Sequence, residues 1–403
     1  MRKYFKNNYL PAMLGATIEY YDIALYGYMA PILIKVFFPD LDKTLAYFLY
    51  FLFEFFASLS QLAGAYFFGV IGDKYGRKPA MYSSMIGISF STFITCILPT
   101  YTQIGIFATI LFIFIRALQC FFLGGEYNGG AIYCLEHEEN TKKHGVISGL
   151  YCAFTASGII LASLVAALCN HMGKEYFRIA YALSFVLALL IYKLRSNLKE
   201  TSAYLRVNRN QQDTKFLKVR PILSIIIASL FFGIIYGLPT RIFNALLPIA
   251  TNIESNQIII LNIFSLVFYT GLLLFSGLLA DKYGAEKIMR FAAILVSILS
   301  YPLMKLIQSG SITYIIIAKI VFTFLTAVFI GPFHSFAQSL SLSGSRYRNI
   351  SVSYTIGKCF SSILLASSFL IYDHFKNITI LGLILSIIAI ITTRIIHEIP
   401  AKK

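Results

Sequence analysis

Eight ionisable side chains stand inside long apolar stretches of this chain, away from their ends: Glu19, Asp22, Glu54, Arg116, Glu126, Arg241, Lys319 and Lys358. In a membrane, each charge would cost at least about 2.5–3.5 kcal/mol at the bilayer centre. Together, unpaired, they would cost on the order of 20 kcal/mol, more than the ~5–15 kcal/mol by which most proteins are stable. We therefore expect these groups to pair, to change protonation or to face water. Because acids and bases are equal in number, a cavity lined by them would be formally neutral and would suit a zwitterion at least as well as a dianion.

A pair of carboxylates near the start of the chain is the clearest chemical signal. Glu19 and Asp22 are three residues apart and Tyr26 follows four residues later, so all three share one face of a helix. Two carboxylates this close in a medium of low dielectric resist ionising together. One of them can then take up and release a proton near neutral pH, and we hypothesise that Asp22 is this proton acceptor. Glu126 is a candidate for a second relay acid or for a partner of Lys358.

The elements that must position these groups are membrane-spanning helices. The chain is 58% hydrophobic and only 13% charged, against about 25% charged residues in soluble domains. A span needs about 20 mostly apolar residues. The pattern predicts an all-α membrane protein with twelve transmembrane helices in two sets of six, over residues 10–38, 45–71, 80–98, 104–134, 144–169, 177–195, 219–248, 257–279, 287–307, 311–340, 347–371 and 377–396.

Positive charges indicate the orientation of these helices. Most of the 34 Lys and Arg residues fall at the two termini, in alternate loops and in the polar connector 196–218. Because cationic loops stay in the cytoplasm, we expect both termini and the connector to be cytoplasmic. The net charge of +16 follows from this topology rather than from nucleic-acid binding. The first apolar run contains Glu19 and Asp22 and has no small-residue cleavage site, so we expect a retained helix and not a signal peptide.

A ten-residue phrase occurs twice, from Gly69 to Lys78 and again from Gly277 to Glu286. Each copy ends one apolar run and precedes the next. A duplication of this kind in a membrane chain indicates two similar halves around a shared midplane site, which is a common plan of solute carriers. The sequence therefore predicts an N-terminal six-helix bundle over 1–195, a connector over 196–218 and a C-terminal six-helix bundle over 219–403.

Matched helix breaks precede the two copies. Tyr26-Gly27 and Tyr236-Gly237 lie at similar distances before them, with Pro31 or Pro239 just beyond. Gly and Pro interrupt a membrane helix where freed backbone groups find other partners or water, and matched interruptions indicate the solute site. We expect the first and seventh helices to line the cavity. The alternative is that Gly and Pro are simply commoner in membrane helices than in soluble ones.

The phrase from Gly69 to Lys78 resembles the signature of the major facilitator superfamily in the loop between its second and third helices. Within that superfamily the chain resembles the metabolite:proton symporters, which include proline/betaine carriers. The similar stretches are Glu19 to Gly27, Arg116 to Gln119 with Gly124 to Gly130, Tyr236 with Pro239-Thr240, and Lys199 to Thr201. The resemblance implies the major facilitator fold and transport by alternating access.

The resemblance also implies roles for particular residues. Arg116 would be the cationic partner that holds Asp22 ionised until a proton or solute arrives, although a permanent structural ion pair is the alternative. The repeated loop would clip the two halves together through Asp73 and Arg77, and this clip would be weaker in the second copy, where Ala285 and Glu286 replace the basic pair. The residues of this gating motif are Gly69, Asp73, Gly76, Arg77, Gly277, Asp281 and Gly284.

The second half supplies candidates for solute contacts. Tyr354 and Lys358 are four residues apart on one helix, and Arg241 follows the break near Pro239. A solute carboxylate would find its counter-charge there. Tyr20, Tyr26 and Tyr236 are aromatic faces for a quaternary ammonium group, or else ordinary packing residues in a chain that is 16% aromatic.

The leading hypothesis is a proton-coupled symporter, monomeric and multi-pass in a bacterial inner membrane, that imports a small zwitterion such as proline or glycine betaine. The alternatives are a proton-coupled transporter of organic mono- or dicarboxylates and a transport-like receptor that binds without flux. The sequence contains no nucleotide-binding loop, no spacing typical of metal ligands and no nucleophile and base pair. We therefore expect neither an enzyme nor an ATP-driven pump, and neither a cofactor nor a metal.

Overall fold

The computed structural model describes residues 9–39, 43–138, 140–196, 198–206, 219–251 and 253–397, and every regular element in these ranges is helical. Eleven of the described helices are long and apolar enough to cross a membrane. The predicted all-α membrane fold is thus confirmed. The long elements are α4 (Lys43–Lys74), α5 (Arg77–Ile97), α7 (Ile106–His137), α8 (His144–Met172), α9 (Phe177–Arg195), α11 (Val219–Gly237), α13 (Ser255–Tyr283), α14 (Ala285–Gln308), α15 (Ile312–Ile330), α17 (Arg346–Phe375) and α18 (Thr379–His397).

Shorter helices complete three of the predicted spans. The first predicted helix is divided at Met29 into α2 (Leu10–Tyr28) and α3 (Ala30–Phe37), and α2 contains the two acids that lower its hydropathy. The seventh continues from α11 through one π turn, η5 (Leu238–Ile242), into α12 (Phe243–Ala250). The tenth continues from α15 into α16 (Phe333–Ser339). Outside the spans lie the small helices α6 (Tyr101–Ile104), η2 (Thr141–Lys143), η3 (Lys174–Tyr176) and α10 (Ser202–Arg206).

The chain forms two compact units that exchange short segments. Unit 1 comprises residues 1–139, 154–216 and 342–355, and unit 2 comprises residues 140–153, 217–341 and 356–403. The start of α8 therefore belongs to unit 2, and the start of α17 belongs to unit 1. The proposed boundary at 196–218 lies partly outside the described residues and stays a prediction.

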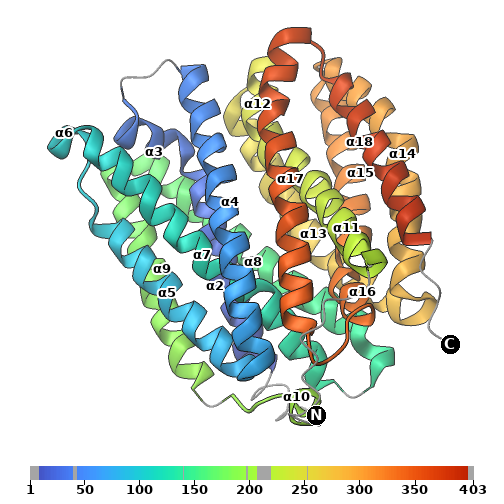
Figure 1. Ribbon diagram of the computed structural model, residues 1–403. Helices are drawn as coiled ribbons and strands as arrows, with labels where there is room; N and C mark the ends of the chain where they lie inside the picture. Colours follow the sequence, from blue (N-terminus) through green and yellow to red (C-terminus); the bar gives the residue numbers. More distant parts are fainter. Residues whose placement is uncertain are drawn as a thin grey trace. The chain divides into compact units, whose positions relative to one another are not determined.

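Glycines allow the helices of unit 1 to approach closely. A Cβ atom on Gly64 of α4 would lie 1.7 Å from the carbonyl oxygen of Phe121 on α7, and one on Gly124 of α7 would lie 2.4 Å from the carbonyl oxygen of Gln61. Small residues at helix interfaces are typical of membrane bundles, where close backbone approach replaces the hydrophobic effect. Figure 1 shows α4, α5, α7 and α9 running alongside one another within this unit.

The break in the seventh span has a clear backbone cause. Pro239 has no N–H, so the carbonyl of Ile235 loses its helical donor. The hydroxyl of Thr326, on α15, donates to this carbonyl over 3.0 Å. The hydroxyl of Thr240 donates to the carbonyl of Tyr236 over 2.6 Å. A membrane interior offers no water to freed carbonyls, so these two threonines allow the break to persist.

A second break, between α15 and α16, is supported by the start of α8. The hydroxyl of Ser148 donates to the carbonyl of Gly331 over 2.5 Å and accepts the N–H of His334 over 3.2 Å. These three residues all belong to unit 2. The segment that unit 2 takes from α8 thus has a structural role in that unit.

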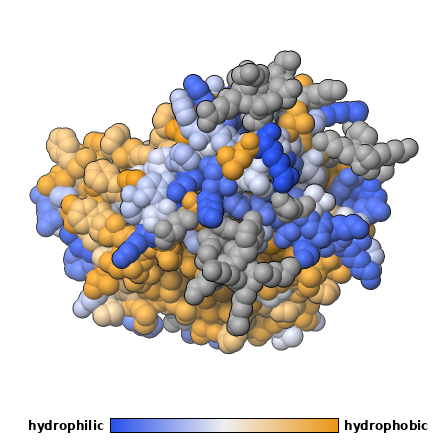
Figure 2. Space-filling model, turned by 90° about the horizontal axis from the view of Figure 1, so that it is seen from below, coloured by the Kyte–Doolittle hydropathy of each residue, from blue (hydrophilic) through white to orange (hydrophobic). Residues whose placement is uncertain are grey.

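The outward faces of the long helices are strongly apolar. Phe107 on α7 and Phe264 on α13 are 67% and 70% exposed. Exposed apolar side chains on many helices are expected where lipid replaces water. The face that Figure 2 shows gathers hydrophilic residues, with hydrophobic residues around its edge.

Candidate functional site

Asp22 is buried in unit 1 among neutral hydrogen-bond donors. Its side chain belongs to a residue that is 1% exposed, on α2. The hydroxyl of Thr92, on α5, donates to Asp22 Oδ2 over 2.8 Å, and the hydroxyl of Ser184, on α9, donates to Oδ1. The two uncharged hydroxyl groups thus orient the carboxylate and connect α2 to α5 and α9.

A chain of hydrogen bonds connects Asp22 to Arg116. Arg116 donates to Gln119 Oε1 over 2.6 Å, and Gln119 Nε2 donates to the hydroxyl of Thr92 over 2.9 Å. The amide of Gln119 must present its oxygen to Arg116, because a guanidinium group only donates. Every donor in the chain therefore points from the cation toward the carboxylate. The structure brings together the predicted pair, but through Gln119 and Thr92 rather than by a direct ion pair among the described residues.

Arg116 is buried against an aromatic stack. Its guanidinium carbon lies 4.2 Å from the centroid of the Tyr26 ring, which stacks on Tyr50 of α4 at 4.3 Å. The two tyrosines also exchange hydrogen bonds, since each hydroxyl donates to the carbonyl of the other. These contacts fix the ring of Tyr26 with its face toward the guanidinium group of Arg116. The Nε atom of Arg116 is buried and has no hydrogen-bond partner among the described residues.

A second aromatic group lies along the same helix. The ring of Tyr20 contacts that of Tyr127, on α7, at a centroid distance of 5.0 Å, and Tyr127 contacts Tyr354, on α17, at 5.1 Å. These three rings thus form one row of aromatic contacts across α2, α7 and α17. Glu19 precedes Tyr20 and is 2% exposed. Tyr127 was not among the predicted site residues.

Glu126 forms a buried ion pair with Arg195, the last residue of α9. Its other carboxylate oxygen accepts the hydroxyl of Ser84 over 3.1 Å. Arg195 also donates to the carbonyl of Ala12 at the start of α2, and a Cβ on Gly15 would overlap its guanidinium group. The ion pair thus connects α7 to the end of α9 and, through Arg195, to the start of α2. The role of Glu126 as a relay acid stays a prediction.

The remaining predicted solute contacts lie in unit 2. Tyr236, on α11, faces Tyr269 of α13 at a centroid distance of 6.0 Å, and Arg241 lies in the π turn that follows. Lys358 lies on the part of α17 that belongs to unit 2, where its carbonyl accepts the hydroxyl of Ser361. Their solute contacts stay predictions.

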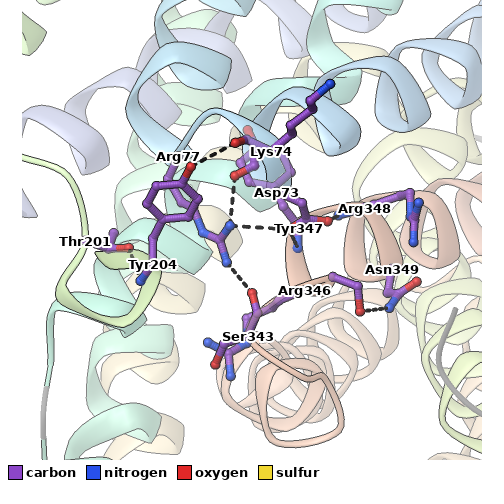
Figure 3. A network of polar contacts seen from close by, with 12 residues as sticks. Asp73, Lys74, Arg77, Thr201, Tyr204, Ser343, Arg346, Tyr347, Arg348 and Asn349 are labelled. Carbon is purple, nitrogen blue, oxygen red and sulfur yellow. Dashed lines mark hydrogen bonds and ion pairs between the residues drawn. The ribbon is translucent and has the colours of Figure 1, made fainter. Parts of the chain in front are cut away.

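Asp73, in the last turn of α4, anchors the loop that follows this helix (Figure 3). The two carboxylate oxygens of Asp73 accept the backbone N–H groups of Tyr347 and Arg348, each over 3.0 Å. These N–H groups belong to the first turn of α17, where a helix has unsatisfied donors and a partial positive charge. Gly76 has a φ of 116°, and a Cβ there would lie 2.3 Å from Glu200 Oε2. Only glycine fits this turn.

Glu136, at the end of α7, binds two arginines and is the centre of a polar network. The sequence analysis did not identify this residue. Arg77 donates to both of its carboxylate oxygens over 2.9 Å, and Arg346 donates over 2.8 Å. Thr201, in the connector, donates its hydroxyl over 2.8 Å. Arg77 is fully buried and also donates to the carbonyl of Ser343. The network thus ties the loop, the connector and the start of α17 together.

The second copy of the loop repeats part of this geometry in unit 2. Asp281 accepts the backbone N–H groups of Gly145 and Val146, over 2.6 and 3.0 Å, at the start of α8. Gly284 has a φ of 95°, as Gly76 has a positive φ in the first copy. Ala285 stands where the first copy has Arg77. An alanine side chain cannot donate to a carboxylate as Arg77 does to Glu136.

Comparison with known proteins agrees with this architecture. The model of the family described as "Sugar (and other) transporter" matches residues 8–221, which is more than half of the chain. A Staphylococcus aureus (strain COL) protein named for proline/betaine transport is 28% identical over 85% of this chain and 77% of its own. The proline/betaine transporter of Escherichia coli (strain K12) is 25% identical over 94% of this chain and 80% of its own.

Solved structures show the same fold. The proton:xylose symporter XylE bound to 6-bromo-6-deoxy-D-glucose superimposes with a TM-score of 0.81 at 14% identity, over 98% of this chain and 95% of that one. An all-helical multi-pass membrane chain with a duplicated loop, this family match and this fold together exclude an enzyme. The chain belongs to the sugar (and other) transporter family of the major facilitator superfamily and is a transporter of small solutes.

Proposed function

We propose that this transporter is a proton-coupled symporter that imports a small zwitterionic metabolite by alternating access. The observation that carries the proposal is the polar chain from Arg116 through Gln119 and Thr92 to Asp22. It connects a buried acid that can hold a proton to a buried cation with an unused donor.

The proton acts through the hydroxyl of Thr92. While Asp22 is ionised, Thr92 donates to it and accepts from Gln119. Once Asp22 Oδ2 carries a proton, its O–H donates to Thr92, whose own hydrogen must turn away. Protonation therefore reverses one bond of the chain and loosens the orientation of Gln119 and Arg116. Once its orientation is loosened, Arg116 can turn its Nε atom, which has no hydrogen-bond partner among the described residues, toward a solute carboxylate, and such charge-assisted bonds are the strong ones.

The relatives support the choice of a zwitterion. One of them, the glycine betaine/proline/ectoine/pipecolic acid transporter OusA of Dickeya dadantii (strain 3937), is 25% identical over 94% of this chain. Each solute in that name has a carboxylate and a cationic nitrogen. Arg116 would bind the carboxylate, with Glu19 as the counter-charge for the nitrogen. The proposed contacts of Tyr20, Tyr354, Tyr236, Arg241 and Lys358 with the solute belong to the same proposal.

The proposed orientation has both termini in the cytoplasm of a bacterial cell and the protein, as a monomer, in the inner membrane. Arg77, Arg346 and Arg348 lie near the Asp73 loop, and cationic residues favour the cytoplasmic side. The network around Glu136 would then be a cytoplasmic gate that must open once per cycle.

The test is uptake by purified protein in liposomes with an imposed pH gradient. Labelled proline and glycine betaine should accumulate when the outside is acidic, and a dicarboxylate should not compete. Arg116→Gln should abolish accumulation, whereas Gln103→Glu, a change in the small helix α6 outside the spans, should not. Accumulation that ignores the pH gradient would contradict the proton coupling. Competition by a dicarboxylate alone would favour an organic-anion transporter.

A further inference from the structure

The side chain of Tyr347, in the first turn of α17, is inserted into unit 1. The residue is fully buried, and its hydroxyl donates to the carbonyl of Gly125 on α7. Its ring lies against Gly72 of α4. A tyrosine at the start of a helix that continues into the other unit is thus enclosed by two helices of this one.

Glycines create the space that the ring occupies. A Cβ on Gly72 would lie 2.4 Å from the ring of Tyr347, and one on Gly129 of α7 would lie 1.9 Å from its hydroxyl oxygen. Real Cβ atoms do not approach so closely, so any other residue at either position would exclude the ring. We call the space bounded by Gly72, Gly125 and Gly129 the glycine slot.

The backbone of the same tyrosine is held as well. Its N–H donates to Asp73, one residue after Gly72, while its hydroxyl reaches Gly125. Figure 3 shows Tyr347 next to Asp73 at the start of α17. Two contacts at opposite ends of one residue fix both its position and its direction. The bond from the backbone N–H to Asp73, which we call the cap of α17, would by itself leave the side chain free to turn.

The second copy of the loop has the cap but not the slot. Ala280 precedes Asp281 as Gly72 precedes Asp73, and it carries the Cβ that the first copy excludes. The residue whose N–H meets Asp281 in the place of Tyr347 is Gly145, which has no side chain to insert. Where the first copy has Gly72 and Tyr347, the second copy therefore has Ala280 and Gly145. Both copies cap the start of a helix through an aspartate, but only the first copy has an inserted aromatic ring.

We propose that Tyr347 is a positioning residue of the transport cycle, a bolt that holds the first turn of α17 against α4 and α7 through the glycine slot and must leave the slot before α17 can move. Because the second copy has no bolt, the start of α17 is held more firmly at the first copy than the start of α8 is at the second. This inference rests on alternating access and not on the identity of the solute or on proton coupling.

The experiment measures exposure of the latched segment of α17. Ser351, one turn beyond Tyr347, is fully buried, and Ser351→Cys is a conservative change. The reporter is placed in a chain whose six cysteines have been replaced, and its labelling by a maleimide is timed in nanodiscs. Tyr347→Ala should raise the labelling rate by at least about tenfold. Tyr347→Phe, which keeps the ring and loses one hydrogen bond, should raise it by about two- to tenfold.

A double-mutant cycle separates the bolt from general packing. Gly72→Ala should raise labelling as Tyr347→Ala does, and it should add nothing once Tyr347 is already alanine. Ala280→Gly, the matched change in the second copy, should leave labelling unchanged. Additive effects of Gly72→Ala and Tyr347→Ala would overturn the proposal, as would unchanged labelling in monodisperse Tyr347→Phe. Tyr347→Phe keeps the test decisive if the alanine variants fail to fold.

Discussion

Removing the hydroxyl of Thr92 is the sharpest perturbation of the polar chain. Thr92→Val keeps the shape of the side chain and deletes the donor to Asp22 Oδ2 together with the acceptor for Gln119. Asp22 would keep the bond from Ser184 alone. The ionised carboxylate loses a charge-assisted hydrogen bond, whereas the protonated form loses only the weaker neutral bond from its own O–H, so the protonated form persists to higher pH.

The size of the change follows from one bond to a charged group. Such a hydrogen bond contributes about 1.5–3 kcal/mol, against about 0.5–1.5 kcal/mol for the neutral bond of the protonated form, and one pH unit corresponds to about 1.36 kcal/mol. The alkaline limb of the pH profile for solute binding should therefore move upward by about 1 pH unit. Proton release should become slower, so net uptake should fall more than equilibrium exchange.

The assay is solute counterflow in liposomes with no pH gradient, measured over a series of pH values. Thr92→Ser keeps the hydroxyl and should behave like the wild type. Thr95→Val removes a neighbouring hydroxyl that donates only to the carbonyl of Ser91, and it should leave the profile unmoved. A Thr92→Val profile that superimposes on that of the wild type would refute the coupling of Asp22 to this chain.

Three further changes test other parts of the structure. Glu136→Gln leaves Arg77 and Arg346 without their shared carboxylate, and breaking a buried ion pair costs about 3–5 kcal/mol. Uptake should therefore fall. The added change Arg77→Gln should restore part of the thermal stability. Thr326→Val should lower the unfolding free energy by about 1–3 kcal/mol, because the Ile235 carbonyl loses its donor; in a Pro239→Ala background, which restores the backbone N–H, calorimetry should show little further loss. Asp73→Asn should lower uptake without affecting membrane insertion, as judged by the amount of purified protein, and normal transport in this variant would reject the gating role.

The sequence predicts the helices well because hydropathy and length constrain a membrane span strongly. The ranges 80–98, 177–195 and 377–396 agree closely with α5, α9 and α18. Hydropathy does not register a backbone break, so the predicted helix over 10–38 is in fact two helices that meet at Met29. The span 219–248 likewise contains one π turn, which depends on a proline and on Thr326 from a helix distant in sequence.

The candidate site could be predicted only where residues share a helix. Asp22, Glu19 and Tyr26 follow helical spacing, and the loop residues are marked by the repeat. Thr92, Ser184 and Gln119 come from three other helices, and hydroxyl residues are too common in membrane helices for their types to identify them. Glu136 lies at the end of an apolar run and gives no signal beyond its charge.

Tyr347 illustrates a signal that was present but could not be interpreted without the structure. The glycines of the loop and those from Gly124 to Gly130 indicate close approach, yet nothing in their spacing names what approaches them. The residue that enters the glycine slot lies more than two hundred residues further along the chain. Only the tertiary contact connects the two patterns.

Proton movement coupled to the solute can be measured directly. Purified protein in liposomes with a pH-sensitive dye inside receives glycine betaine or proline in the absence of any imposed gradient. The wild type should acidify the lumen when solute is added, whereas Asp22→Asn should not, although the variant still exchanges labelled solute. Acidification of equal size in the Asp22→Asn variant, or uptake by the wild type with no proton movement, would contradict the proposed proton coupling.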